Sequence, residues 1–350
     1  MTTSTKITWL HNPHKVVSAA LQHYALNATR LAPMSSTSNA VFRVATADGD
    51  FTLRLHRFDE TGIETTEWLK YITSELLWLQ ALSRDTDLNV PHPLANQYGE
   101  LVTLIDTDED KQVFCSALGW MEGRFYNAGL RPAHLERMGE LTARLHNYSE
   151  SGQFVPPPDF YRDRADALDG PNKNFEFPPM QSDVREAADY LNRLCSVFDA
   201  AVGKIVVAAI EQVWSDLGDF GMDNDRFGLI HADIHQWNYM FWQGKPKLID
   251  FNNVGYAHYL YDFSVILNNL LDRDDYAVLR DATLQGYQRI RPLPANHRRY
   301  MRSLIALRNL QLIQWTLIWP VGSLERKQRW YDVEESLRHL RLYVANEGDW

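Results

Sequence analysis

The sequence has few cysteines and no long apolar run. Cys115 and Cys195 are its only cysteines, and neither lies in a metal-binding or disulfide-type spacing. The most apolar stretch, LIQWTLIW at residues 312–319, is far shorter than the roughly 20 residues that span a membrane. The N-terminus lacks the uninterrupted apolar segment of a signal peptide. These absences predict a cytoplasmic protein without disulfides or a membrane partner.

Basic residues are also in the minority, since 35 Lys and Arg face 45 Asp and Glu and give a net charge of -10. Nucleic-acid binding depends on Lys and Arg that neutralise phosphates, so this balance argues against a nucleic-acid partner. It favours a cationic or zwitterionic small partner instead. The 350 residues are 45% hydrophobic, which is enough to bury the cores of two lobes. The oligomeric state is left open.

The stretch HADIHQWNYMFWQGKPKLIDF at residues 231–251 is the part of the chain richest in chemically active side chains. It contains Asp233, Asn238 and Asp250 at spacings that suit Mg²⁺-assisted phosphoryl transfer, in which positioning and charge neutralisation supply most of the catalysis. Asp233 is the candidate for orienting and deprotonating a hydroxyl group. Asn238 and Asp250 are the candidate magnesium ligands.

A predicted hairpin explains why those two ligands could meet. Residues 239–242 and 247–249 have strand composition, and they flank a turn at residues 243–245 that contains Gly244. Asn238 and Asp250 are equally distant from Gly244, so this turn would bring them face to face, with Cβ atoms about 5 Å apart. Mg²⁺ accepts one or two protein oxygens and completes its shell with phosphate and water.

The same stretch resembles the catalytic core of the aminoglycoside phosphotransferase and choline kinase-like family, whose H-x-D-x-H-x-x-N loop is followed by an I-D-F strand end. Here the loop runs from His231 to Asn238, and Ile249-Asp250-Phe251 supplies the strand end. The resemblance implies that His231 braces the loop and that Asp262 supports it. Protein kinases carry D-F-G at the second motif. Asn252 stands in place of that Gly, so small-molecule kinases are the closer likeness.

This resemblance implies an α+β, protein-kinase-like fold with a small β-rich N-lobe and a larger, mainly helical C-lobe. The N-lobe would be residues 1–122 and bind the nucleotide. The C-lobe would be residues 123–350 and hold the catalytic loop and the acceptor. Apolar periodicity independently predicts helices at 15–26, 63–83, 135–148, 260–271, 276–290 and 294–319, with others within 183–217 and 324–346. Strands are expected at 39–46 and 51–57, joined by an Asp-Gly turn, and within 99–106 and 112–123.

The expected ATP site draws on several parts of the N-lobe. Glu75 lies on the apolar stripe of the 63–83 helix, where a carboxylate is costly unless it is paired. Arg54 occupies the position of the kinase lysine, and this Arg–Glu pair would grip the phosphates. The resemblance adds Ser36, from a loop over the phosphates that here lacks its glycines, and the backbones of Gly119 and Met121 for adenine. Alternatively, Arg54 and Arg57 are solvated strand charges and Glu75 sits at the edge of the stripe.

The acceptor is the less determined side of the reaction. Details of the sequence look most like the subgroup with type II homoserine kinases and stress-linked Ser/Thr kinases, so a small amine-bearing alcohol, an aminoglycoside and a protein Ser/Thr all fit. Three acidic residues of the irregular segment 154–180 are candidates to bind an amine, namely Asp159, Asp163 and Asp166. Alternatively, they are surface charges that pair with Arg162 and Arg164.

Two further interpretations fit parts of the sequence. A nucleotide-binding pseudokinase is favoured by the missing lysine and glycines, although Asp233, Asn238 and Asp250 are complete. A metal-dependent hydrolase would use His231, Asp233 and His235 as metal ligands, since H-x-D-x-H can bind zinc or iron. The hydrolase interpretation leaves Glu75 and the hairpin unexplained, and we take His235 as structural.

Overall fold

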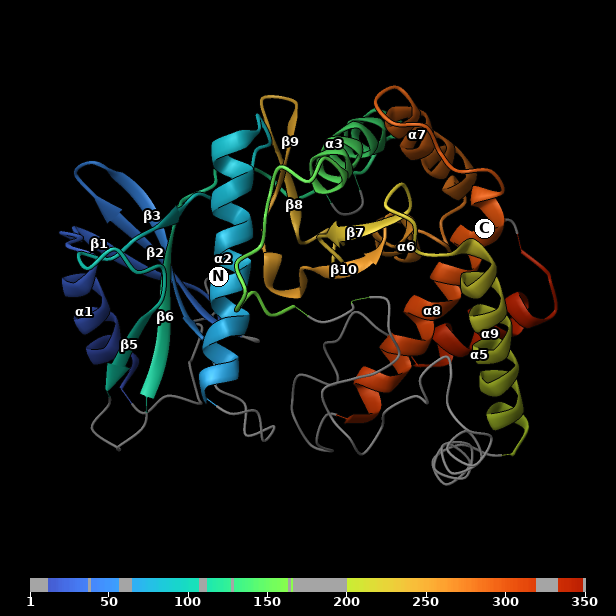
Figure 1. Ribbon diagram of the computed structural model, residues 1–350, viewed down its shortest axis with the longest axis horizontal. Coiled ribbons are helices and arrows are strands. Elements are labelled where there is room, and N and C mark those ends of the chain that lie inside the picture. Colours follow the sequence, from blue (N-terminus) through green and yellow to red (C-terminus); the bar gives the residue numbers. More distant parts are fainter. Residues whose placement is uncertain are drawn as a thin grey trace. The chain divides into compact units, whose positions relative to one another are not determined.

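A computed structural model describes residues 12–36, 39–56, 65–106, 112–126, 129–162, 165, 200–318 and 333–348. Two compact units divide the chain. The first contains Met1–Arg124, Phe154–Arg162 and Met240–Asn252, and the second contains Phe125–Gln153, Asp163–Tyr239 and Asn253–Trp350. An antiparallel sheet dominates the first unit and helices dominate the second (Figure 1). The predicted α+β class is therefore confirmed.

The sheet of the first unit has six strands in the described part of the chain, all antiparallel. Their spatial order is β1 (Arg30–Ser36), β2 (Asn39–Thr46), β3 (Gly49–His56), β6 (Gln112–Gly119) and β4 (Pro93–Leu94), with β5 (Thr103–Asp106) also paired to β6. Thr46 faces Gly49 where β2 turns into β3, and Gly49 has a φ of 132° that favours glycine. The predicted Asp-Gly hairpin is present.

Strand β1 was not expected, because residues 32–39 have the composition of a loop. The strand forms at the edge of the sheet by pairing with β2 from Arg30 to Ser36, with a register shift between Pro33 and Ser35. Proline lacks the N–H that a central strand needs, but it is tolerated at edges and bulges. Pairing with a neighbouring strand thus overrides the local composition.

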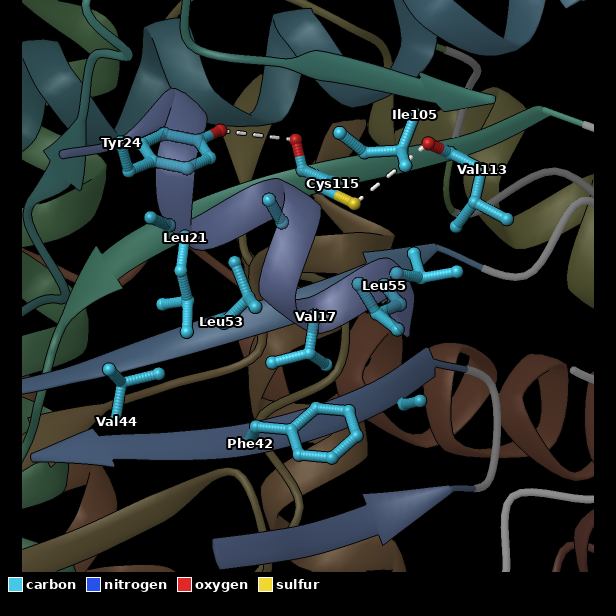
Figure 2. Packing of buried hydrophobic residues seen from close by; sticks show 14 residues of the cluster. Val17, Leu21, Tyr24, Phe42, Val44, Leu53, Leu55, Ile105, Val113 and Cys115 are labelled. Atoms are coloured by element: carbon cyan, nitrogen blue, oxygen red, sulfur yellow. Dashed lines mark hydrogen bonds between the residues drawn. The ribbon is translucent and has the colours of Figure 1, made fainter. Parts of the chain in front are cut away.

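Helix α1 (Pro13–His23) covers the hydrophobic core of this sheet (Figure 2). Asn12 accepts a hydrogen bond from the backbone of Lys15 at the helix start, where Pro13 costs no internal bond. Val17 and Leu21 pack against strand residues that are at most 2% exposed, namely Phe42, Val44, Leu53 and Leu55. Each buried aliphatic side chain contributes about 1.5–3 kcal/mol, so this core fixes β3 in place.

Helix α2 (Thr65–Asp85) and the hairpin of β8 (Tyr239–Trp242) and β9 (Lys245–Leu248) complete the regular structure relevant to the site. The turn of this hairpin contains only Gln243 and Gly244, which have φ values of 49° and 75°. The predicted three-residue turn is therefore wrong, because Lys245 is already the first residue of β9. Asn238 precedes this turn by five residues and Asp250 follows it by six, so the predicted symmetry about Gly244 does not hold.

The second unit is mainly helical. Its helices are α3 (Pro132–Glu150), α5 (Ala200–Phe220), α6 (Leu260–Asn268), α7 (Tyr276–Gln288), α8 (His297–Ile318) and α9 (Val333–Val344). Strands β7 (Phe227–Ile230) and β10 (Gly255–His258) pair antiparallel, and a short 3₁₀ helix η1 spans Phe251–Asn253. The helices predicted at 135–148, 260–271, 276–290 and 294–319 are confirmed, whereas residues 183–199 and 324–332 lie outside the described chain. None of the described helices has the length and apolarity needed to cross a membrane.

Helices α3 and α7 pack closely because each has a glycine at the contact. A Cβ atom on Gly139 of α3 would overlap the backbone of Thr283, and one on Gly286 of α7 would overlap the backbone of Glu136. This pair holds His146 of α3 beside Tyr287 of α7, with the two side chains hydrogen-bonded at 3.0 Å. The same histidine contacts Asp262 of α6 at 3.0 Å.

Candidate active site

The loop His231–Asn238 follows strand β7 and is held by the buried carboxylate of Asp262. The backbone N–H groups of His231 and Ala232 donate to Asp262 Oδ2 and Oδ1 at 3.3 and 2.7 Å. Ala232 has a φ of 63°, a conformation that costs a non-glycine residue about 1–3 kcal/mol and persists only where its surroundings enforce it. Asp262 is fully buried within the first turn of α6. It therefore fixes the loop, and it does not act as the cap of its own helix.

His146 extends this support, and sequence reasoning missed it. Its Nε2 lies 3.0 Å from Asp262 Oδ2, and its Nδ1 lies 3.0 Å from the hydroxyl of Tyr287. Burial lowers the pKa of His146, and this effect outweighs the neighbouring Asp262, which raises it. The ring is thus neutral near pH 7. In the sequence, His146 is a single histidine on the apolar face of a helix and carries no pattern that indicates this role.

The carboxylate of Asp233 receives side chains from three other places in the second unit. Arg308 of α8 donates to Oδ1 at 2.7 Å, while Asn238 and Asn253 donate to Oδ2 at 3.2 and 2.9 Å. Burial raises the pKa of Asp233, but the nearby Arg308, His235 and His231 and the hydrogen bond from Asn253 outweigh it and hold that pKa below its ordinary value. The carboxylate is therefore ionised and oriented.

Asn238 is oriented by the same contacts. Its Nδ2 donates to the backbone oxygen of Asp233 at 2.9 Å as well as to the carboxylate. With the amide nitrogen turned to Asp233, the amide oxygen is the atom left for a hard cation. Asn253 and Arg308 were not identified from the sequence, because they lie 20 and 75 positions from Asp233 in the sequence and belong to no local motif.

In the first unit, Arg54 of β3 and Glu75 of α2 form the ion pair that the sequence predicts. Arg54 Nη1 lies 2.6 Å from Glu75 Oε1, and the two side chains are only 6% and 2% exposed. The solvated-charge alternative is therefore wrong for this pair, and Arg57 lies outside the described residues. Arg54 also donates from Nε to Ser116 at 3.2 Å and from Nη1 to the side chain of Asn252 at 3.2 Å. Its buried Nη2 has no hydrogen-bond partner among the described residues.

Asp250 lies in the first unit, two residues before Asn252. Its φ of 60° is again a left-handed value that a strand would not have, and its side chain is exposed. The backbone thus leaves the line of β9 at Asp250 and presents a carboxylate to solvent. Asn252 anchors the far side of this bend through its contact with Arg54.

Gly119 and Met121, whose backbones the resemblance assigns to adenine, lie at the end of β6 and just after it. The N–H of Gly119 donates to the backbone oxygen of His92 at 2.8 Å, so its carbonyl is the group that could contact a base. Met121 follows, partly buried, before Gly123, where a Cβ atom would overlap Met240. Ser36 is the last residue of β1, beside the connection to β2.

The two histidines of the H-x-D-x-H motif contact the backbone of their own loop. His231 and His235 each have Nδ1 next to a backbone N–H, of Asp233 at 3.3 Å and Trp237 at 3.2 Å. Among the described residues, the side chains close enough together to be able to hold a metal ion are Asp272, Glu335 and His339, so H-x-D-x-H does not form a metal cluster.

The surface role given to Arg162 is wrong, because its side chain is 0% exposed. Asp159 is exposed. Asp163, Arg164 and Asp166 lie outside the described residues.

The residues fit a divalent cation and a polyphosphate on chemical grounds. The amide oxygen of Asn238 and the carboxylate of Asp250 are hard oxygen donors of the kind Mg²⁺ takes. The unpartnered N–H groups on the buried guanidinium of Arg54 match an anionic phosphate.

Comparisons with known proteins agree with this chemistry. Residues 30–302 match the phosphotransferase enzyme family. An amicoumacin kinase of Bacillus subtilis (strain 168) is 21% identical over 273 residues, which cover 75% of this chain and 69% of that protein.

Solved structures of two kinases show the same fold. A microcompartment-associated aminopropanol kinase has a TM-score of 0.67 and 24% identity, with 95% of this chain and 94% of that chain covered. An amicoumacin kinase in complex with AMP-PNP, Ca²⁺ and Ami has a TM-score of 0.70 and 18% identity, with 97% of each chain covered. The predicted protein-kinase-like fold is confirmed.

Proposed function

The chain belongs to the phosphotransferase enzyme family, and from this premise we propose that it transfers the γ-phosphoryl group of ATP to a hydroxyl group of a small, amine-bearing alcohol. The observation that carries this proposal is the environment of Asp233. Its carboxylate is ionised and held by Arg308, Asn238 and Asn253. Such fixed orientation is what phosphoryl transfer requires, since positioning supplies most of the rate.

In this mechanism Asp233 accepts a hydrogen bond from the acceptor hydroxyl and takes its proton late in the transfer. A loose transition state needs little base strength at the outset, so a carboxylate whose pKa lies below its ordinary value is suitable. His231 and Asp262 hold the loop that carries Asp233. Because both oxygens of Asp233 are already hydrogen-bonded, the hydroxyl approaches a carboxylate that cannot rotate.

Side chains and backbone groups together bind the donor in this proposal. Arg54, paired with Glu75, faces the phosphates, Ser36 lies over them, and the backbones of Gly119 and Met121 contact the base. Asn238 and Asp250 would hold Mg²⁺, which would neutralise charge on the phosphates. Residues 1–122 would thus bind the nucleotide, and residues 123–350 would supply the catalytic loop and bind the acceptor.

A small acceptor is favoured over a protein because the similar chains include an amicoumacin kinase and an aminopropanol kinase. The net charge of -10 supports an acceptor that carries an amine. A Ser/Thr protein kinase of the same fold is the second candidate, and a pseudokinase is the third. The intact, ionised Asp233 argues against the pseudokinase.

Mg²⁺-dependent ADP release from the purified chain tests the proposal. Acceptors would be a three-carbon amino alcohol, a homoserine-like hydroxy amino acid, an aminoglycoside and a generic Ser/Thr protein substrate. We expect turnover that depends on one of the small alcohols. Phosphorylation of the protein alone would replace our proposal with the second candidate. ATP binding without turnover on any acceptor would favour the pseudokinase.

A further inference from the structure

The segment Phe154–Arg162 belongs to the first unit although the sequence places it after helix α3. It is attached along α2 by side chains of several kinds. Phe154 contacts the buried Trp78 edge to face, with ring centroids 5.0 Å apart, and the backbone N–H of Tyr161 donates to Ser74 at 2.8 Å. These contacts follow α2 toward its first turns, and they deliver Arg162 to the neighbourhood of Glu75.

Arg162 is completely buried there. Its guanidinium carbon lies 3.9 Å from the ring centroid of Tyr71, and its Nη1 donates to the backbone oxygen of Asn252 at 2.6 Å. Its Nη2 lies 3.9 Å from Glu75 Oε2. Burying an arginine is costly unless its charge and its N–H groups find partners. The stacking, the hydrogen bond and the nearby carboxylate therefore fix Arg162 in one position relative to these partners.

Asn252 is the residue on which these contacts converge. Its backbone oxygen accepts hydrogen bonds from Arg162 and from Tyr71, the latter at 3.2 Å, and its side-chain oxygen accepts one from Arg54. Asp250, which we assign to the metal, is only two residues away and has a φ of 60°. The backbone that presents the carboxylate of Asp250 is therefore fixed at its far end by Arg162.

Glu75 is shared between two guanidinium groups. Its Oε1 contacts Arg54, and its Oε2 faces Arg162. Two cations and one carboxylate leave this buried cluster one unit positive, and buried His56 adds no charge because burial first, and then Arg54 and Arg162, lower its pKa well below the ordinary value. Arg54 thus keeps positive charge that Glu75 alone would cancel, and its unpartnered Nη2 can serve an anion.

We propose that Arg162 is a positioning residue for the Mg²⁺–nucleotide complex: it holds Asn252, and through it Asp250, while it shares Glu75 with Arg54. The inference rests on the proposed function, which supplies the ligand. It gives the segment Phe154–Arg162 a part in nucleotide binding, where the sequence indicated an acceptor-binding or surface segment. The ligand contacts Arg54 and Asp250, and Arg162 acts through them.

The test compares binding of Mg²⁺–ATP, ATP without Mg²⁺, and adenosine to the full chain by calorimetry and competition. Arg162→Met keeps a long side chain but removes the charge and the hydrogen bonds. We expect it to weaken Mg²⁺–ATP binding at least tenfold and to raise the Mg²⁺ concentration required, with adenosine binding unchanged. Arg84→Met is the control, since Arg84 lies on the same helix as Glu75 but is 66% exposed and pairs with Asp85. It should bind all three as the wild type does.

Arg162→Lys provides a second variant if the methionine variant does not fold. Lysine keeps the charge, but it cannot donate to Asn252 and face Glu75 through one rigid plane. We expect an intermediate loss of Mg²⁺–ATP affinity, again without change for adenosine. If the folded variants bound Mg²⁺–ATP within twofold of the wild-type affinity, the role of Arg162 would be overturned and the proposed function would stand. A wild-type chain that binds no Mg²⁺–ATP would overturn the proposed function and this inference together.

Discussion

Arg308 donates from Nη2 to Oδ1 of Asp233 across 2.7 Å, and both side chains are 14% exposed. The pair joins helix α8 to the loop after β7 within the second unit. At this distance and degree of burial, the guanidinium stabilises the ionised carboxylate far more than a solvated pair would. The charge state of Asp233 therefore depends on a residue outside the catalytic motif.

Replacing Arg308 with methionine should alter the pH dependence of the reaction. Burial raises the pKa of Asp233, and Arg308 is the foremost of the groups that hold it below the ordinary value. Without Arg308 that pKa rises, so the ionised form is lost at a higher pH as the solution is acidified. The acid limb of kcat/KM should move to higher pH, which steady-state rates between pH 4 and 8 would measure.

Arg298→Met is the control for that shift, because Arg298 lies on the same helix but is 57% exposed and pairs with Asp281. Its acid limb should match that of the wild type. An unchanged acid limb in Arg308→Met would mean that Arg308 does not govern the ionisation of Asp233.

Asp233→Asn should slow transfer strongly while nucleotide binding persists. The amide is nearly isosteric but cannot take the proton of the hydroxyl, and such a group contributes about 10²–10⁴ to the rate. We expect kcat to fall by at least about 100-fold, with the Kd for Mg²⁺–ATP within a factor of about three. Initial rates and calorimetry measure the two quantities separately.

The contrasting variant is Asp250→Ala, which should lose Mg²⁺-dependent ATP affinity because it removes a proposed metal ligand. Full activity in Asp233→Asn would refute its assignment as base. Unchanged Mg²⁺-dependent affinity in Asp250→Ala would refute the assignment of the metal ligand.

Local patterns in the sequence were sufficient for several helices, for one β-hairpin and for one long-range pair. The apolar stripe of α2 indicated that Glu75 is a carboxylate that requires a cation as its partner. Arg54 Nη1 lies 2.6 Å from its Oε1. The Asp-Gly turn and the helices α3, α6, α7 and α8 follow from periodicity and turn chemistry in the same way. The turn and the helices are indicated by residues that lie close together in the sequence. The Arg54–Glu75 pair is indicated because a buried charge requires a partner.

Contacts made by tertiary packing could not be predicted in this way. Arg308 and Arg162 appear in the sequence as ordinary helix and loop arginines. Only the packing within each unit brings Arg308 to Asp233 and Arg162 to Asn252. Strand β1 depends on its pairing with β2, and the two-residue turn at Gln243 depends on left-handed φ values at non-glycine as well as glycine positions. None of these features has a local pattern that distinguishes it.

Asp262→Ala should destabilise the second unit and impair the catalytic loop. The carboxylate accepts hydrogen bonds from the backbones of His231 and Ala232 and contacts His146, all in a fully buried position. Removing it leaves buried N–H groups unsatisfied, at a cost of about 3 kcal/mol in the free energy of unfolding. Urea denaturation measures this loss, and kcat should fall with little change in nucleotide affinity.

Asp219→Ala is the matched control, since this carboxylate is 58% exposed and its partner Arg299 is 50% exposed. It should change the free energy of unfolding by no more than about 0.5 kcal/mol. Equal stability losses in the two variants would show that Asp262 has no special supporting role.

The two glycines between α3 and α7 should not tolerate alanine, although alanine is the better helix former by about 1 kcal/mol. A methyl group on Gly139 would overlap the backbone of Thr283, and one on Gly286 would overlap that of Glu136, so the helices must separate. We expect each variant to lower the free energy of unfolding by about 1–3 kcal/mol. Because His146 and Tyr287 lie on the same two helices, separation should also weaken the support of Asp262 and reduce kcat.

Gly218 of α5 supplies the control, because a methyl group there would have no described atom within 4 Å other than those of its chain neighbours and of the nearby backbone of its own helix. Gly218→Ala should therefore stabilise the protein by about 0.5–1 kcal/mol through helix propensity alone. Urea titration of all three variants distinguishes the two effects by their opposite signs. If Gly139→Ala and Gly286→Ala were as stable as Gly218→Ala, close approach of the helices could not be the reason for glycine, and the position of His146 would have to be maintained by other contacts.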